Sequence, residues 1–598
     1  MNSVKSYVGL LGIALVMAPA GYGQSRGNRT PQLSTDTGFV NNLTRKYKPN
    51  YVAPIDLSNS GRLDQLIRAG NLYLSLNDAI ALALENNIGL EIQRYQFDLT
   101  EVAYQSSLAG TNGNFDPTFT VNQFNFNHQA TPVTNAVGTS GATNITDSYN
   151  RGFQFQQTLK TGATGTFGFT STKSSTNNAN ANFVPNLGGN LTLNLTQPLL
   201  RGYGVSLNTI NIKTAANNKR VADTGFRTQV NTLLNQVVGA YWNLVSASLN
   251  VGVSRQSLEL SQRLLEQNKQ QIQIGTMAPI DIKQTEAQVA TGEQNLITAE
   301  ATVYNQEVAL KNILSRNGLA SATLSSVHII PTNRVEVPAV EPVTPIQDLM
   351  DAALRNRPEL AQSRINLENT QLNLKSTKNN LLPQFNLTGG LNNPASGGVV
   401  NSAPNVVGGV VVPRNVNLER TGGFSNVLYQ LFALPTVNYN IGFTFTLNLR
   451  NRSAQAAYAT AQLNQRVQEL TLQNQVNQMR ADVQTAQNNV TSARARLNSA
   501  DRGLAAQEAV VDGTQRKYQL GTSTLFEVIQ QQNSLATARQ NVVTAQVAYA
   551  AAKLAIDLAT GNLMERYNIV FDEAKDGTLS RRADPIPDVV NQNGAAGR

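Results

Sequence analysis

The residue types that most often do chemistry in proteins are sparse in this chain of 598 residues. It has no cysteine, which excludes disulfides, thiol catalysis and a lipid-modified N-terminal cysteine. His128 and His328 are the only histidines, and they lie far apart in a chain without cysteine, so the sequence predicts no metal site. Asp348, Asp351 and Glu359 are scattered acids on predicted helices and do not form a paired-carboxylate site. We expect no catalytic residue and no cofactor.

Two Gly-Thr pairs have the clearest spacing of the remaining polar residues. Gly275-Thr276 and Gly521-Thr522 each follow a long helical pattern, at the place where a glycine commonly caps a helix. An acid follows each glycine by six residues, Asp281 in the first case and Glu527 in the second. Taken alone, each acid is a solvated carboxylate in the first turn of the next helix, where it complements the helix dipole.

The two Gly-Thr pairs belong to an internal duplication of the chain. Residues 230–314 superpose without a gap on residues 476–560, at a shift of 246 positions. A second match pairs residues 78–90 with residues 348–360 at a larger shift, so the halves differ by insertions between the blocks. Each half is therefore predicted to be one copy of the same supersecondary unit.

Coiled-coil periodicity runs through the long block of each half. Apolar or small residues recur at intervals that alternate between three and four, from Val230 to Ile272 and from Val476 to Tyr518. The pattern resumes after each Gly-Thr pair, which predicts antiparallel helical hairpins at about 204–318 and about 453–561. A helix from residue 204 to 273 would be on the order of 100 Å long.

The segments that precede the hairpins have the alternation of β-strands. Residues 191–195 and 439–449 alternate apolar and polar side chains, and partner strands begin after Pro117 and Pro383. Long polar or Gly-rich stretches, 130–150, 171–189 and 389–435, separate the strands as extracellular loops do in outer-membrane barrels. Four strands per chain are fewer than the roughly eight of the smallest membrane barrel, so a homo-oligomer must share it. A further hairpin at 153–159 and 165–170 stays open.

The N-terminal segment and the net charge of the chain give two further predictions. Residues 1–23 have the charged, apolar and small-residue regions of a secretory signal peptide, which predicts export. The net charge is +9, but only 14% of residues are charged and the basic ones are scattered, so nucleic acid is not an expected partner.

Three local patterns resemble the TolC family of outer-membrane efflux proteins. They are the opening helix at residues 74–87, the strand-to-helix passage Gln-Pro-Leu-Leu-Arg-Gly-Tyr-Gly at 197–204, and Arg-Pro-Glu-Leu at 357–360. The resemblance covers about residues 72–563. It implies a mainly α protein with a membrane β-barrel: a homotrimer whose 12-stranded barrel continues into a 12-helix periplasmic tunnel, with two internal repeats per chain.

The resemblance also implies partners and site residues. The channel would meet outer-membrane lipid, a periplasmic adaptor (membrane fusion) protein and an inner-membrane pump of the RND, ABC or MFS type. Adaptor tips would enter grooves around Ile274-Gly275-Thr276 and Leu520-Gly521-Thr522. The periplasmic entrance would be charged by Glu527, with Gln530 where the best-known members carry a second acid. Asp281 and Tyr518 match two partners of the network that holds the entrance shut, and Ser523 stands where its arginine is expected.

These patterns predict the following organisation and function. A signal peptide (1–23) and an N-terminal extension (24–71) precede a first repeat (72–340, strands about 115–197) and a second repeat (341–563, strands about 384–449). The tail at 564–598 is either disordered or wrapped around the middle of the tunnel. The expected function is a passive exit duct of a tripartite efflux pump or type I secretion system, in the outer membrane and reaching into the periplasm. Two alternatives stay open, a periplasm-spanning structural coiled-coil tether and a solute-specific porin.

Overall fold

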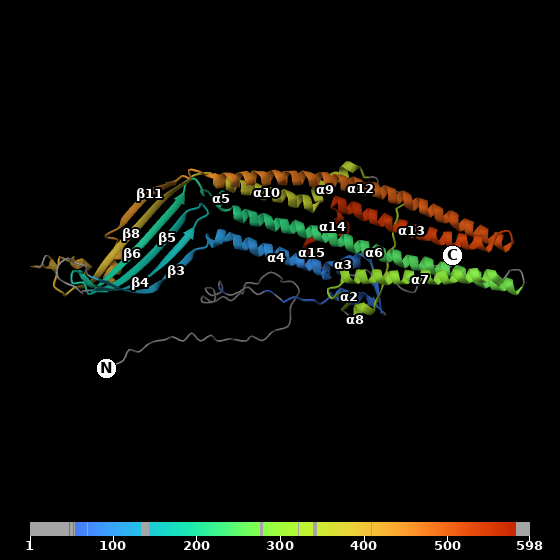
Figure 1. The fold of residues 1–598 in the computed structure, drawn as a ribbon, viewed down its shortest axis with the longest axis horizontal. Helices are drawn as coiled ribbons and strands as arrows, with labels where there is room; N and C mark the ends of the chain where they lie inside the picture. Colours follow the sequence, from blue (N-terminus) through green and yellow to red (C-terminus); the bar gives the residue numbers. More distant parts are fainter. Residues whose placement is uncertain are drawn as a thin grey trace, which may run out of the picture. The chain divides into compact units, whose positions relative to one another are not determined.

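The computed structural model describes residues 47, 52, 54–68, 70–132, 143–274, 279–320, 322–338, 344–407 and 410–581. The predicted signal peptide and most of the N-terminal extension lie outside the described residues, as do Gly275 and Thr276. The chain divides into two units, Met1–Leu57 and Ser58–Arg598. The second unit carries the named helices and strands (Figure 1).

Two long helical hairpins form most of this unit. In the first, α6 (Ile210–Gln273, 64 residues) is followed by α7 (Pro279–Leu314). In the second, α12 (Arg452–Gln519, 68 residues) is followed by α13 (Leu525–Thr560). At 1.5 Å per residue the outgoing helices are about 100 Å long. Figure 1 shows the four helices running alongside one another away from the sheet.

The helices pack through the predicted heptad positions. Most of the predicted heptad positions on α6 and α12 are buried, and many carry residues small enough for helices to approach closely. Each buried leucine or valine contributes about 1.5–3 kcal/mol to folding. The coiled-coil prediction is confirmed by the buried positions, which are Val230, Leu233, Val237, Leu244, Ala247, Ser254, Leu258, Ser261 and Asn268 on α6, and Met479, Val483, Ala486, Val490, Ala493, Leu497 and Val511 on α12.

Four helices lie side by side at each level of the bundle. Next to the sheet the order is α4 (Ile88–Leu108), α6, α10 (Pro358–Asn379) and α12. Toward the hairpin turns α7 and α13 take the places of α4 and α10, which gives the order α7, α6, α13, α12. One edge of the bundle is therefore made by α4 and α7, and the other edge is made by α12.

Short elements form a compact junction around the middle of the bundle. It contains the short helices α2 (Gly61–Leu66), α3 (Leu76–Asn86), α8 (Ala322–Ser326) and α9 (Ile346–Asn356). A small sheet joins β1 (Ile67–Arg68), β2 (Asn71–Leu74) and β7 (His328–Pro331). The end of the predicted second repeat and the start of the predicted tail form α14 (Leu563–Arg566) and α15 (Phe571–Asp576). Leu563 of α14 and Ala574 of α15 are buried in the junction core.

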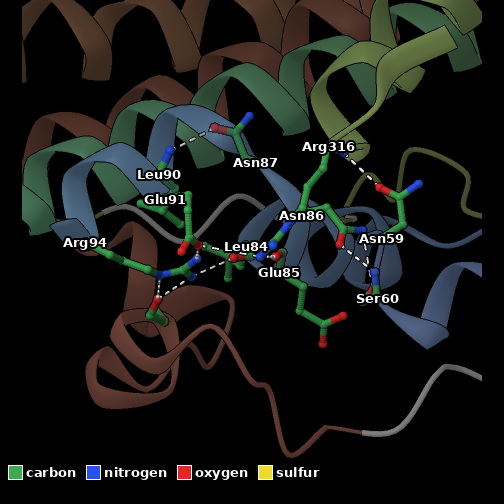
Figure 2. Close-up of polar contacts among 11 residues, drawn as sticks. Asn59, Ser60, Leu84, Glu85, Asn86, Asn87, Leu90, Glu91, Arg94 and Arg316 are labelled. Carbon is green, nitrogen blue, oxygen red and sulfur yellow. Dashed lines mark hydrogen bonds and ion pairs between the residues drawn. The ribbon is translucent and has the colours of Figure 1, made fainter. Parts of the chain in front are cut away.

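Buried polar side chains tie the junction together (Figure 2). The Arg94 guanidinium, on α4, donates to the carbonyl oxygens of Leu84 (2.7 Å) and of Ala574 (2.6 Å). Asn86, at the end of α3, donates to the carbonyl of Leu314, where α7 ends (3.1 Å). These carbonyls lie in the last turns of helices and are shielded from water. Each hydrogen bond therefore avoids the free-energy cost of leaving a buried polar group unpaired.

The large sheet lies at the end of the bundle that holds α4, α10 and the start of α12 (Figure 1). Six strands pair antiparallel in the order β11, β8, β6, β5, β4, β3. Their bounds are Thr118–Pro132 (β3), Thr143–Thr158 (β4), Thr164–Thr176 (β5), Phe183–Pro198 (β6), Gln384–Val400 (β8) and Asn438–Thr446 (β11).

The sheet thus has two strands more than the four that the sequence identified directly. The hairpin left open by the sequence is present as β4 and β5, joined by a short turn at residues 159–163. The stretches at 130–150, 171–189 and 389–435, expected as loops, contribute residues to these strands and to β6 and β8. Their Thr, Asn and Gly residues hid the alternation, because the face of the sheet that they occupy is polar.

The two faces of the sheet differ in chemistry. The strand register aligns the apolar side chains on one face, while Thr, Asn, Gln and Ser alternate with them on the other. An apolar outer band around a polar interior is the pattern of outer-membrane barrels. The residues of the apolar face include Phe119, Val121, Phe126, Tyr149, Phe153, Phe155, Phe167, Phe169, Leu187, Leu191, Leu193, Leu195, Phe385, Leu387, Leu391, Tyr439, Ile441, Phe443 and Phe445.

Within the described part of the chain, α13 is the one helix long and apolar enough to cross a membrane by length and composition. However, Tyr549, Ala552 and Leu554 on this helix are buried against neighbouring elements, and α13 packs along both α12 and α6. It is a core helix of the bundle.

Candidate site at the hairpin tips

The turn of the second hairpin is closed by a glycine cap. Gly521 has φ +73°, in the left-handed region that favours glycine. The N–H of Thr522 donates to the carbonyl of Lys517 (2.9 Å), and that of Gly521 to the carbonyl of Tyr518 (3.0 Å). This is the bonding of a Schellman cap, which ends α12 and starts the turn. A Cβ at Gly521 would meet no atom within 4 Å, so the space beside the turn is open.

Glu527 begins the returning helix as half of a capping box. Its N–H donates to the Thr524 hydroxyl (3.3 Å), and its carboxylate accepts from the N–H of Thr524 (3.3 Å). The Ser523 hydroxyl also donates to the carboxylate, at 2.5 Å. These hydrogen bonds, led by that of Ser523, lower the pKa of Glu527, although the side chain is exposed. Glu527 therefore stays ionised and holds the start of α13.

Tyr518 connects the second hairpin to the first. Its hydroxyl lies 3.0 Å from Asn268 Oδ1 and 3.4 Å from Gln271 Oε1, both on α6. Burial raises the pKa of Tyr518, and the charge of Asp281 adds to this effect. Asp281 is thus close enough to act on the phenol, but no hydrogen bond joins the two among the described contacts.

Asn268 is a contact residue of the tip that the sequence pattern did not single out. It is fully buried, at 0% exposure, and its side-chain amide nitrogen has no hydrogen-bond partner in the described part of the chain. A signal was present, because Asn268 occupies a heptad core position, where a polar residue commonly specifies one pairing of helices. Its partner Tyr518 lies in the other hairpin, so only the approach of α12 to α6 reveals the bond.

An apolar cluster supports this polar contact. Leu264 of α6 packs with Leu525, Val528 and Ile529 of α13, next to Tyr518. Gln530, one turn beyond Glu527, is exposed and lines a groove along α13 together with Phe526 and Asn533. Asn533 accepts a hydrogen bond from Gln288 of α7 (2.7 Å). The tip is therefore held by contacts between the hairpins as well as within them.

Exposed apolar residues recur on both turns. Ile274 and Ile280 flank the first turn and are 74% and 73% exposed, while Leu520 and Phe526 occupy the duplicated positions of the second turn and are 79% and 60% exposed. Large apolar side chains are therefore exposed at equivalent positions of the two turns. Within the described residues, no group of three or more His, Cys, Asp or Glu is placed to hold a metal ion.

Comparisons with known proteins give a consistent result. Residues 164–316 and 349–562 match the family model described as outer membrane efflux protein. The chain is 24% identical over 233 residues to toxin and drug export protein A of Aggregatibacter actinomycetemcomitans, which covers 39% of this chain and 44% of that protein. It is 21% identical over 385 residues to outer membrane protein TolC of Escherichia coli K12, covering 63% of this chain and 71% of that protein.

Solved structures share the fold. The Campylobacter jejuni CmeC outer membrane channel superposes with a TM-score of 0.54 at 15% identity, over 89% of this chain and 98% of that one. The open state of the Neisseria gonorrhoeae MtrE outer membrane channel gives 0.51 at 15% identity, over 86% and 98%.

The Tyr518 contact predicts a measurable change at the tip. Tyr518→Phe removes the bond to Asn268 and leaves a buried oxygen unpaired, which costs about 1–3 kcal/mol. Trypsin should then cleave the tip at Arg516 or Lys517 about fivefold faster or more, because local opening becomes more populated. The matched control is Tyr304→Phe on α7, where the ring is 56% exposed. Equal cleavage rates in Tyr518→Phe and the parent chain would show that this bond does not hold the tip.

Proposed function

The chain belongs to the outer membrane efflux protein family, and we propose that it is the exit duct of a tripartite efflux pump or type I secretion system. It lies in the outer membrane and extends into the periplasm. It would conduct substrates passively from an inner-membrane pump to the outside. The names of the relatives, an export protein for toxin and drug and the TolC channels, fit this role.

One observation carries the proposal: the two-faced sheet continues directly into helices about 100 Å long. β3 follows α4, β6 leads into α6 through the short helix α5 (Val205–Asn208), β8 follows α10, and β11 leads into α12. A duct lined by the polar face of the sheet would thus open into a space enclosed by the helices. A tether would not need the six-stranded sheet, and a porin would not need the long helices.

The sheet also supports assembly with further copies of the chain. Among the described strands, β3 and β11 each have one side without a strand partner. They run in opposite directions, so β3 of one copy can pair antiparallel with β11 of the next. The same two edges continue into the helices, since α4 and α7 extend the β3 edge and α12 extends the β11 edge. Repeating this contact closes a ring.

Exposed apolar side chains line both helical edges. They stand at the three-, four- or seven-residue spacing of coiled-coil seams, as expected for surfaces that a neighbouring helix covers. They are Ile92, Leu99 and Val102 on α4, Ile297 and Tyr304 on α7, and Leu463, Val467 and Leu470 on α12.

We propose that three copies form the ring, as the family resemblance implies. Four helices at each level then make a tunnel of twelve helices, in agreement with that resemblance. Three copies of six strands make a barrel of eighteen, not the twelve expected from it. Because barrel diameter grows roughly linearly with strand number, the barrel would be about half as wide again as a 12-stranded one. Barrels of 16–18 strands enclose an aqueous channel.

Cysteine cross-linking tests this assembly, because the chain has no native cysteine. Variants that combine Leu99→Cys or Val102→Cys with Leu463→Cys or Val467→Cys should form disulfide-linked dimers and trimers in outer-membrane extracts. Each single variant serves as the control and should give no ladder. The purified trimer should also conduct ions in a planar bilayer. A monodisperse, conducting monomer in mild detergent would contradict the shared barrel.

The hairpin turns are the proposed adaptor site. Ile274, Leu520 and Gly521 combine exposed apolar surface with an open turn, and Gly275, Thr276 and Thr522 complete the duplicated pair. An adaptor protein whose own tip is apolar would cover these residues. Behind the adaptor we place an inner-membrane pump of the RND, ABC or MFS type.

Gly521→Tyr should abolish export while the trimer still assembles. The ring would fill the open space beside the turn, whereas the strain of a non-glycine residue in the left-handed region costs only about 1–2 kcal/mol. Gly521→Ala has the same strain without the ring and should retain export. Gly503→Tyr, on the exposed surface of α12, is a second control. Export is measured as accumulation of a dye substrate in cells, and wild-type export by Gly521→Tyr would count against the adaptor site.

Glu527 is proposed to make the entrance cation-selective, with Gln530 one turn further in and Asp281 and Tyr518 behind the tip. Glu527→Gln removes the charge but keeps a capping-box partner for Thr524, so the helix start should remain intact. The reversal potential in a planar bilayer under a salt gradient should then lose most of its cation preference. Glu359→Gln, at the start of α10, should not change it. An unchanged potential in Glu527→Gln would leave this carboxylate only its capping role.

The pH dependence of this selectivity follows from the lowered pKa of Glu527. The carboxylate remains charged down to pH values below its ordinary pKa of about 4.3, and selectivity should fade only as the pH falls through the lowered value. A loss of selectivity already near pH 6 would require a raised pKa, and would therefore contradict this local geometry.

A further inference from the structure

A short helix crosses the apolar face of the sheet. α11 (Phe424–Ala433) lies between β8 and β11 in the chain, within a stretch that the sequence predicted as loop. Its buried residues Val427 and Leu431 pack against one face of the sheet only, at Ala395 of β8, Leu187 and Leu191 of β6, and Phe169 of β5. The strand register places these partners on the apolar face. α11 therefore lies on the outside of the sheet and not in the proposed lumen.

The packing of α11 is close and fixed. A Cβ at Gly189 would lie 2.8 Å from Val427 and 2.9 Å from Leu431, so the glycine makes room for the helix. The Arg151 guanidinium, on β4, lies 5.5 Å from the centre of the Phe424 ring. α11 thus spans from β4, at its first residue, to β8, at its last turn.

α11 also completes the edge of β8 at the end of the sheet that is distant from the bundle. β11 pairs with β8 only from Gln384 to Asn392. Beyond that point, the Gln430 side chain accepts from the N–H of Ser396 (3.3 Å) and donates to its carbonyl (3.1 Å). Asn393 in turn donates to the carbonyl of Leu431 (2.8 Å). The amide side chain of a helix thus takes the place of a strand next to β8.

The outer surface of α11 carries aromatic residues and has cations beside it. Tyr429 and Phe432 are 73% and 77% exposed. Arg151 and Lys173 are exposed, and the register places both on the same face of the sheet as α11. The acid closest to them in the register, Asp147, already pairs with His128 at 2.6 Å. The surface beside the helix therefore carries net positive charge.

We propose that α11 is an interfacial helix that binds the outer leaflet of the outer membrane. Tyr429 and Phe432 would lie at the boundary between headgroups and acyl chains, where aromatic girdles flank the apolar band of a barrel. Arg151 and Lys173 would meet the phosphates of anionic lipid headgroups. The surface is continuous with the lipid-facing side of the sheet, which is why lipid and not a soluble protein is the fitting occupant. The inference rests on the proposed function only in taking the apolar face to contact the membrane.

Tryptophan fluorescence tests the position of the helix. Trp242 is the only tryptophan, so Trp242→Phe gives a background without this fluorophore. Tyr429→Trp in that background would be reconstituted as the full-length trimer in vesicles that contain bromine-labelled phospholipids, which quench nearby tryptophan. Tyr439→Trp, on the apolar face of β11, is the lipid-exposed reference, and Leu520→Trp, at the tip of the second hairpin, is the reference distant from the sheet. All three positions are exposed, so folding should persist.

We expect Tyr429→Trp to lose as much emission as Tyr439→Trp, with stronger quenching by bromine near the headgroup. Behaviour like that of Leu520→Trp would place α11 in water and overturn the inference. Blue-shifted emission without lipid quenching would place it against a second copy of the chain, which also overturns it. If Tyr439→Trp itself is not quenched, the fault lies with the proposed membrane face of the sheet and hence with the proposed function.

The cations are tested by anionic lipid. Phosphatidylglycerol added to the trimer in neutral detergent should raise the temperature of unfolding more than phosphatidylcholine does. Arg151→Gln and Lys173→Gln should each weaken the apparent affinity for phosphatidylglycerol by about fivefold. The matched control is the pair Arg263→Gln and Lys283→Gln, on exposed helix surfaces of the bundle. An unchanged affinity in the Arg151 and Lys173 variants would remove the headgroup site from the proposal.

Discussion

A backbone in a lipid bilayer must have all its hydrogen bonds satisfied within protein, and much of this fold depends on that constraint. The six-stranded sheet cannot be lipid-exposed with two open edges, so β3 and β11 require partners that one chain does not supply. The helical edges that continue from these strands also need a partner, because they expose apolar side chains. The edges of the sheet and the edges of the helical bundle would therefore be covered by the same neighbouring copy of the chain.

The constraint also explains details within one chain. β11 is shorter than β8, and the length that it leaves uncovered is met by the Gln430 amide. Gly189 carries no side chain, because Val427 and Leu431 approach the strand too closely for one. Gln430 thus completes the edge of β8, while Gly189 on the interior strand β6 makes room for the helix that carries Gln430.

The sequence predicted the helical part well, because a heptad repeat sustained from Val230 to Ile272 has no other common cause. The number of strands was harder to predict from the sequence. Phe153, Phe155, Phe167 and Phe169 signalled β4 and β5, but their neighbours are Thr, Ser and Gly, which are equally common in loops. α11 is too short for its periodicity to stand out. At the tip, Glu527 could be placed from its spacing, whereas the contact of Tyr518 with Asn268 needed two segments about 250 residues apart in the chain to be brought together.

The short turn between β4 and β5 has a consequence for how such channels diversify. Each other strand of the barrel joins a helix of the bundle, directly or through a short connection, whereas these two meet at residues 159–163 and add nothing to the bundle. Hairpins inserted in this manner return the chain to its starting side and preserve antiparallel order. The width of the barrel can therefore change in steps of two strands per chain while the helical section keeps its bore. Related channels could therefore differ in the width of the outer opening while the contacts of the helical section with partner proteins stay unchanged.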